Sequence, residues 1–347
     1  MSNKNLVIMF DNAPSLHREG ILESIAKSNV LLIFHCASQK DKKHPSEVFI
    51  SKDRFIKSRF KLNSSLSNKR IKNDIVNILS LENYASKNIK IIYSFLDFKR
   101  LDLVLFLKNY FEKNSRDVSL YPLYEPIRIN DFISPLRMIR ISISLIFQRL
   151  ILKPKKLYCF SSLNLFFYKL FFPKQEIIPY QQSLAYIKKC NKLKTNSQFK
   201  NFSILFIGKL INRKNPFLLL KACLELNFKN NLTIVGDGFL NKKLINYYNR
   251  NKNKGKTKLR FIKFLDNNKI PNLLKQNDVL VLPSRFDGFG FVVAEAIYCD
   301  TYVIVSSEVG AKDLITSGIN GSIFRNNSKD ELKNHLIMLY LKLKKYL

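Results

Sequence analysis

Two carboxylates, Asp287 and Glu295, lie eight positions apart in the segment SRFDGFGFVVAEA, on either side of a glycine-rich turn. The residues DVLVLP before this segment predict a strand, and the apolar residues after the glycines predict a helix. Free N–H groups at a helix start, with glycines that allow close approach, favour an anion such as a phosphate. Glu295 follows the first helical turn and leans back toward this site, where a carboxylate can accept two hydrogen bonds from ribose hydroxyls.

Asp287 lies on the loop before the glycines, where it can hold the hydroxyls of a second sugar. Two acids around a phosphate site therefore fit a nucleotide that carries a sugar. Spacing alone leaves a second interpretation open, in which the acids only cap the helix and face solvent. A dinucleotide-binding turn fits less well, because Val293 stands where the third glycine of that pattern is required.

A basic cluster comes earlier in the chain, in the segment FIGKLINRKNPFLLLKA. A strand is predicted to end at Gly208, and Lys209, Arg213 and Lys214 precede a helix that opens with proline. Basic side chains repel the positive end of a helix unless an anion lies between them. The cluster therefore indicates a second phosphate contact, with a solvated basic loop as the other interpretation.

A Gly-Asp-Gly turn begins at Gly236 and follows another predicted strand, in LTIVGDGFL. The three pieces in this order, followed by GINGSIF at 318–324, resemble the donor-binding half of the family 4 glycosyltransferases, which have the GT-B fold. The resemblance covers residues 203–325. The opening LVIMFDNAPSLHREGILESIA and the passage FSS…EIIPY resemble the first domain of that family more loosely.

The resemblance implies a nucleotide-sugar donor on the second domain, an acceptor held mainly by the first, and transfer with retention of anomeric configuration. Glu295 would hold the ribose and Asp287 the donor sugar, while Lys209, Lys214 and loop N–H groups would neutralise the departing diphosphate. The resemblance implies no metal and no cofactor, since the donor, a UDP- or GDP-sugar, is a co-substrate. The implied catalytic residues are Asp287, Lys209, Lys214 and His17, and the implied substrate-binding residues are Gly208, Gly236, Gly288, Phe289, Gly290 and Glu295.

The chain departs from the family's pattern at two positions. The acid-x7-acid signature normally begins with Glu, and Asp287 is one methylene shorter, which changes its reach toward the donor sugar. The Gly-Arg pair of the family is Gly208-Lys209 here, which keeps the charge but loses the bidentate fork of arginine. The family often places a histidine near the reacting sugar. His17, in the loop after the first predicted strand, is the candidate, with a plain surface histidine as the alternative.

The elements that must position these residues alternate between strand-like and helical patterns, which predicts mostly parallel sheets. Residues 51–75 are basic and weakly patterned, and we predict a surface helix or a long loop there. The predicted strands are 6–10, 30–36, 89–95, 118–123, 157–160 and 176–180 in the first half, and 203–207, 232–235, 259–263, 279–282 and 302–305 in the second.

Composition narrows the class of protein. The 59 basic and 26 acidic residues give a net charge of +33, which attracts nucleic acid, anionic lipid or nucleotide phosphates, although a Lys and Asn bias along the whole chain contributes. We find no nucleic-acid-binding motif, and the aromatic residues lie in core-like runs, so nucleic acid is not an expected partner. Five scattered cysteines without a C-x-x-C pair indicate neither a disulfide framework nor a zinc site, and fit a reducing cytosol.

Apolar segments are too short for targeting or membrane-spanning roles. The opening run LVIMF is shorter than a signal peptide, and the longest charge-free runs have twelve residues. We expect a cytoplasmic protein, with the inner face of the cytoplasmic membrane as its place of contact. Residues 134–153 and 164–172 predict core helices. The competing interpretation of 134–153 is an amphipathic face on anionic lipid, which would suit a lipid-linked acceptor.

We therefore predict an α/β protein of the GT-B type, with two doubly wound Rossmann-like domains facing across a cleft. The expected function is sugar transfer from a nucleotide sugar to a glycan or lipid-linked acceptor, in cell-envelope polysaccharide or lipopolysaccharide biosynthesis. A homologue that binds nucleotide sugars without transfer, and a GT-B epimerase, are the alternatives. The predicted parts are an acceptor-side domain (1–187), a linker (188–200), a nucleotide-sugar-binding domain (201–327) and a C-terminal helix (328–347) capped by Ser328 and packed toward the first domain.

Overall fold

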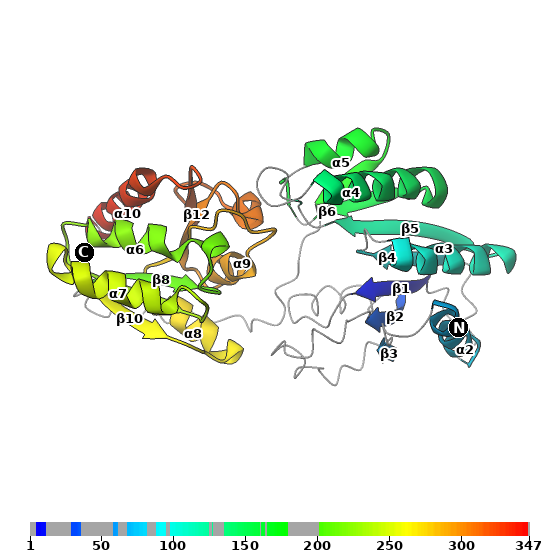
Figure 1. Ribbon diagram of the computed structural model, residues 1–347, viewed down its shortest axis with the longest axis horizontal. Coiled ribbons are helices and arrows are strands. Elements are labelled where there is room, and N and C mark those ends of the chain that lie inside the picture. Colours follow the sequence, from blue (N-terminus) through cyan, green and yellow to red (C-terminus); the bar gives the residue numbers. More distant parts are fainter. Residues whose placement is uncertain are drawn as a thin grey trace. The chain divides into compact units, whose positions relative to one another are not determined.

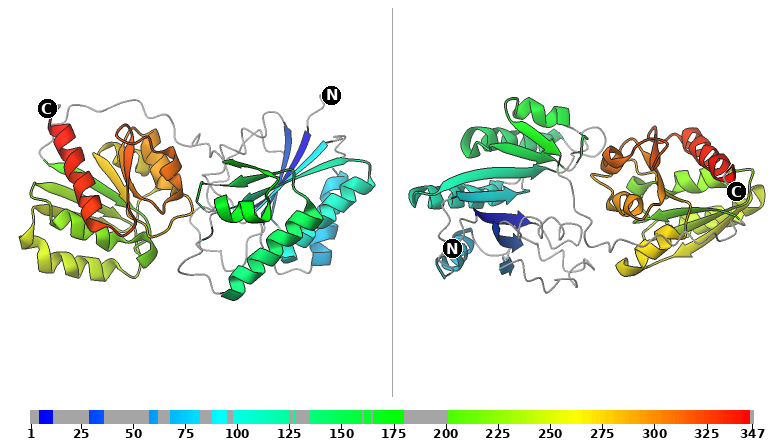
Figure 2. Two further views of the ribbon diagram at one scale, coloured as in Figure 1. Left: turned by 90° about the horizontal axis from the view of Figure 1, so that it is seen from above. Right: turned by 180° about the vertical axis from the view of Figure 1, so that it is seen from behind.

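The structure is a computed structural model, and it describes two compact units, residues 1–186 and 187–347. Each unit has one parallel sheet with its own helices (Figure 1, Figure 2), so the prediction of two Rossmann-like α/β domains is confirmed. His17 and the predicted linker lie outside the described residues. These are 5–11, 29–35, 58–61, 68–81, 88–94, 98–124, 127, 135–159, 161–163, 165–179 and 201–345.

Unit 1 is a seven-stranded parallel sheet in the order β3-β2-β1-β4-β5-β6-β7. Its interior strand β1 contains the uninterrupted apolar run Leu6–Phe10 because an interior parallel strand is buried on both faces, and Leu6, Ile8 and Phe10 are fully buried. The strands are β1 (Asn5–Asp11), β2 (Asn29–His35), β3 (Ser58–Lys61), β4 (Asn88–Tyr93), β5 (Asp117–Tyr124), β6 (Lys156–Cys159) and β7 (Glu176–Pro179), and the helices are α2 (Asn68–Leu81), α3 (Phe98–Lys113), α4 (Pro135–Phe147), the π-helical turn η3 (Gln148–Leu152) and α5 (Leu165–Phe171).

Unit 2 is a six-stranded parallel sheet in the order β10-β9-β8-β11-β12-β13. Strand order reverses between β8 and β11, and in open α/β sheets the carboxyl ends of the strands at such a switch point bind ligands. The strands are β8 (Phe202–Ile207), β9 (Asn230–Val235), β10 (Thr257–Ile262), β11 (Val279–Leu282), β12 (Tyr302–Ser306) and β13 (Gly321–Phe324), and the α-helices are α6 (Pro216–Leu224), α7 (Asn241–Asn251), α8 (Ile270–Lys275), α9 (Phe291–Tyr298) and α10 (Lys329–Lys344).

Two edge strands differ from the prediction. Residues 51–75, predicted as a surface helix or long loop, contain strand β3 as well as the start of α2. Strand β13 lies within GINGSIF, which the pattern does not show as a strand. Both are four residues long, and the sequence SRFK of β3 is half basic, as is common on sheet edges. Neither run is long or apolar enough to show an alternating pattern.

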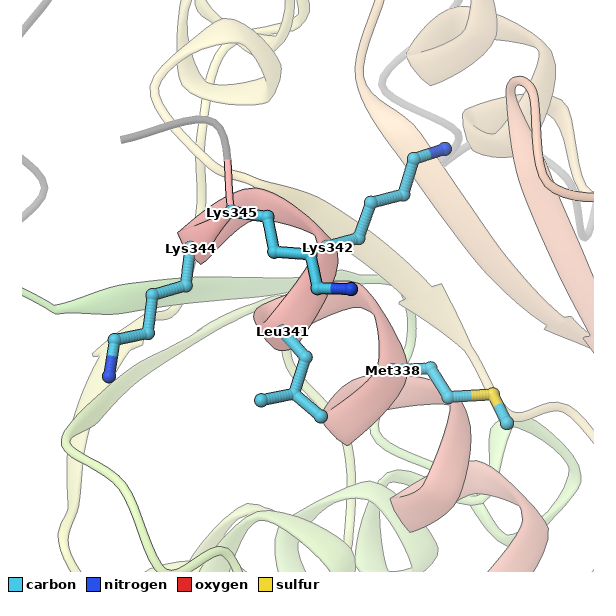
Figure 3. A pocket seen from close by; sticks show the side chains of 5 residues that line it. All are labelled: Met338, Leu341, Lys342, Lys344 and Lys345. Atoms are coloured by element: carbon cyan, nitrogen blue, oxygen red, sulfur yellow. The ribbon is translucent and has the colours of Figure 1, made fainter.

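The helix α10 begins as predicted, with the Ser328 hydroxyl accepting a hydrogen bond from the N–H of Glu331 at 3.3 Å. Within unit 2 it packs on α6 and β13, and Lys329 and Lys333 pair with Glu225 beside α6. A shallow pocket at its end has side chains that fan outward rather than converge (Figure 3), unlike a binding site with a few convergent polar groups.

Candidate functional site

The predicted site residues of the second domain gather at the carboxyl edge of the unit 2 sheet. They lie on the loops that follow β8, β9 and β11 and on helix α9. This edge contains the switch point between β8 and β11, so pieces that are far apart in sequence meet where a doubly wound sheet binds its ligand.

An ion pair joins two of the motifs. The Nζ of Lys214 donates a hydrogen bond to Oδ2 of Asp287, and the two side chains are only 15% and 12% exposed. The Nη1 of Arg213 lies 3.8 Å from Oδ1 of Asp287 and donates to the carbonyl of Phe286 at 2.9 Å. Two cations therefore face one largely buried carboxylate. Arg213 belongs to the basic cluster recognised in the sequence, but nothing in the sequence indicates that it lies beside Asp287.

Backbone hydrogen bonds hold the loop that carries Asp287. Its N–H donates to the carbonyl of Glu308 at 2.9 Å, and its carbonyl accepts from the N–H of Gly310 at 2.9 Å. The N–H of Arg285 also donates to the carbonyl of Arg213 at 2.8 Å. The acid is thus fixed between the loops after β8 and β12, as a site that must hold a substrate in one orientation requires.

Glu295 lies in α9 and is buried, at 7% exposure, as is Asp287 at 8%. Helix α9 has no side-chain cap, and its N-cap is Gly290. The interpretation that both acids only cap the helix and face solvent is therefore wrong. Burying a carboxylate is costly unless it is paired and hydrogen-bonded, which makes two buried acids beside one glycine-rich loop a mark of a specialised site.

Glycine is required at the start of α9. Gly290 has a φ of +87°, and a Cβ there would lie 2.9 Å from Cγ1 of Val309 and 3.0 Å from Cδ2 of Leu282. Gly288 and Phe289 precede it and are partly exposed. The loop can therefore approach a ligand with its backbone, as the phosphate-site prediction demands.

The glycines after β8 and β9 each donate a backbone hydrogen bond to the end of the neighbouring strand. The N–H of Gly208 donates to the carbonyl of Val235 at 2.9 Å, and the N–H of Gly236 donates to that of Ile262 at 2.9 Å. Lys209 follows on this edge and is exposed, so its ammonium group is accessible to a ligand. Asp237 accepts the N–H of Gly238 at 2.8 Å, and this hydrogen bond lowers the pKa of its carboxyl.

Replacing Gly236 by alanine is expected to destabilise unit 2. Gly236 has a φ of +138°, and an added Cβ would lie 2.0 Å from the carbonyl oxygen of Gly208. Strain and overpacking together predict a loss of about 2 kcal/mol or more in the free energy of unfolding, measured by urea denaturation. Gly318→Ala is the control, because Gly318 also has a positive φ, +77°, but nothing lies within 4 Å of its added Cβ. Equal losses in the two variants would contradict the close approach of Gly236 to Gly208.

The described residues bear on metal-binding and thiol chemistry. Those residues include no cluster of three or more His, Cys, Asp or Glu side chains that could hold a metal ion. Cys159, Cys223 and Cys299 are buried and form no disulfide. Burial raises the pKa of the Cys159 thiol to about 12, and a thiol of that pKa is a poor nucleophile at neutral pH.

Unit 2 is similar in sequence to known glycosyltransferases. Residues 189–346 match the family "Glycosyl transferases group 1". A glycosyltransferase of Methanocaldococcus jannaschii is 30% identical over 135 residues, 39% of this chain and 37% of the relative. The Escherichia coli UDP-Gal:alpha-D-GlcNAc-diphosphoundecaprenol alpha-1,3-galactosyltransferase is 33% identical over 151 residues, 42% of this chain and 37% of that enzyme. The alignments thus span well under half of either relative.

The fold comparison extends over both units. The crystal structure of Anabaena HepE in complex with UDP has a TM-score of 0.65 and 16% identity, and the match covers 99% of this chain and 91% of HepE. At that identity the likeness concerns the fold alone. Unit 2 is thus similar in sequence to the group 1 glycosyl transferases, and the two units each have the Rossmann-like fold found in GT-B glycosyltransferases.

Proposed function

We propose that the protein transfers a sugar from a nucleotide-sugar donor to a glycan or lipid-linked acceptor in the biosynthesis of a cell-envelope polysaccharide or lipopolysaccharide. The observation that carries the proposal is the buried Asp287, held by Lys214 and Arg213 at the switch point of unit 2. The E. coli relative, whose name specifies a diphosphoundecaprenol-linked acceptor, supports an acceptor of this class. Transfer would then take place at a membrane surface, on its cytoplasmic side.

In the proposed reaction, a bond forms from the acceptor oxygen to the anomeric carbon as the bond from that carbon to the diphosphate breaks. The diphosphate leaves with added negative charge and takes up the proton that the acceptor hydroxyl loses. Lys209, Lys214 and the N–H groups at the start of α9 would stabilise that charge, and such stabilisation is the largest single contribution in many enzymes. Asp287 would accept hydrogen bonds from the donor sugar, and Glu295 from the ribose.

The finer points of the proposal concern family and stereochemistry. We propose membership of family 4, retention of configuration, a UDP- or GDP-sugar donor and no metal or cofactor. We also propose that Arg213 supplies the guanidinium that the Gly208-Lys209 pair lacks, because Nη1 of Arg213 lies 3.8 Å from Asp287. His17 is the proposed first-domain residue near the reacting sugar.

The proposal is tested by incubating the protein with radiolabelled UDP- and GDP-sugars, with and without polyprenyl-diphosphate-linked acceptors. Label that moves to the acceptor supports transfer, and the anomeric configuration of the product decides retention. Release of free sugar, conversion to an epimer, or binding without reaction would instead support hydrolysis, the GT-B epimerase or the non-transferring homologue. A thermal-shift screen with nucleotides and nucleotide sugars chooses the donor beforehand.

A further inference from the structure

The outward face of α4 and η3 is aliphatic, whereas the outward face of a surface helix is normally polar. The inward side is buried through Ile141, Leu145 and Leu152, so the prediction of a core helix is correct for one face only. The opposite side forms one stripe at helical spacing, and its side chains are between 46% and 72% exposed. We call this stripe the aliphatic face, and it consists of Leu136, Ile139, Ile143, Ile146 and Leu150.

Helix α5 extends this surface. It packs against α4, and the two helices lie side by side in unit 1 (Figure 1). Phe166 is 77% exposed and Leu170, one turn later, is 59% exposed. Large exposed apolar side chains gathered on two neighbouring helices mark an interaction site.

The segment that carries the aliphatic face and α5 has only positive charges. The segment 132–175 has eight Lys and Arg residues and no Asp or Glu. Arg140, Arg149 and Lys169 are exposed on the same helices as the aliphatic face and α5. Aliphatic side chains flanked by cations have the composition of an interfacial helix, whose apolar face enters the boundary between headgroups and acyl chains.

We propose that the aliphatic face and the outer side of α5 dock on an anionic lipid surface. The aliphatic side chains would enter the interface, and Arg140, Arg149 and Lys169 would lie against lipid phosphates, where each basic residue adds to binding. A second copy of the chain is a poorer occupant, because it would bring two acid-free cationic surfaces together and like charges would repel. The inference goes beyond the proposed transfer, since lipid binding requires neither donor nor acceptor.

Cosedimentation with vesicles tests the docking surface. We expect binding to phosphatidylglycerol–phosphatidylcholine vesicles at low salt, little binding to phosphatidylcholine vesicles, and a steep loss as salt rises. Arg140→Gln with Arg149→Gln should weaken partitioning about 5-fold for each arginine. Ile139→Gln with Ile143→Gln should weaken it by about 10-fold, because transfer of apolar surface is lost while the charge is unchanged.

Two matched double variants serve as controls. Met338→Gln with Leu341→Gln removes exposed apolar side chains from α10, and Lys242→Gln with Lys243→Gln removes exposed charges from α7. Both should bind vesicles like the unchanged protein, and all variants should keep nucleotide binding, which separates this inference from the proposed function. Equal losses in the controls, equal binding to neutral vesicles, or unchanged binding of the α4 variants would overturn the proposal. So would a dimer in sedimentation velocity that the Ile139→Gln, Ile143→Gln protein no longer forms.

Discussion

Replacing Lys214 by alanine is expected to lower turnover by about 10²-fold or more, the scale for losing one group that stabilises developing charge. The variant also leaves Asp287 in a largely buried position, 3.8 Å from Nη1 of Arg213. Steady-state transfer from the donor chosen by the thermal-shift screen measures this loss, at a temperature well below unfolding. Full activity in Lys214→Ala would remove this residue from the site.

The same variant has a consequence for stability that the sequence alone does not predict. The sequence assigns Lys209 and Lys214 to the diphosphate rather than to folding. That assignment predicts that alanine at either position leaves the melting temperature nearly unchanged. In the structure, Lys214 forms an ion pair with Asp287 in which both side chains are mostly buried. Breaking such a pair leaves a buried charge without its partner, and we expect a cost of about 1–3 kcal/mol, below the range for fully buried pairs.

Lys209→Ala separates the two effects. Lys209 is exposed, so its removal should lower turnover by about 10²-fold while the melting temperature is retained. Lys242→Ala, an exposed lysine of α7, should change neither quantity. If Lys214→Ala melts like the unchanged protein, its ion pair with Asp287 contributes nothing to stability.

Asp287→Asn and Glu295→Gln are expected to weaken the binding of different ligands. Hydrogen bonds to a charged group contribute about 1.5–3 kcal/mol each, so each variant should lose about 10-fold or more in affinity where its carboxylate contacts the ligand. Glu295→Gln should weaken a bare nucleoside diphosphate and a nucleotide sugar by similar factors, because the proposed contact is to the ribose. Asp287→Asn should weaken the nucleotide sugar alone.

The ion pair between Lys214 and Asp287 makes the expected result for Asp287→Asn more specific. With asparagine at 287, Lys214 loses its carboxylate partner and becomes fully available to the diphosphate, so binding of the bare nucleoside diphosphate should be kept or improved. Calorimetric titration of both ligands against both variants measures this. Equal weakening of the bare diphosphate in the two variants would show that the division of roles between the acids is wrong.

Much of unit 2 can be predicted from its sequence because the evidence is local. Strands β8, β11 and β12 are buried apolar runs, each followed by a glycine or proline turn and a helical segment. The order of elements then determines which loops meet at the carboxyl edge of a parallel sheet. The unit 1 strands other than β3 are predicted for the same reason, since period and length are properties of a short window.

Contacts between distant residues needed the tertiary structure. Lys214 and Asp287 are 73 positions apart, and no local pattern shows that one pairs with the other or that Arg213 joins them. The aliphatic face of α4 has the same composition as a core helix, and its exposure depends on whether another element covers it. The hydrophobic period and the composition of a segment indicate which secondary structure that segment prefers. Which side chains pair, and which stay exposed, depends on the segments that pack together when the chain folds.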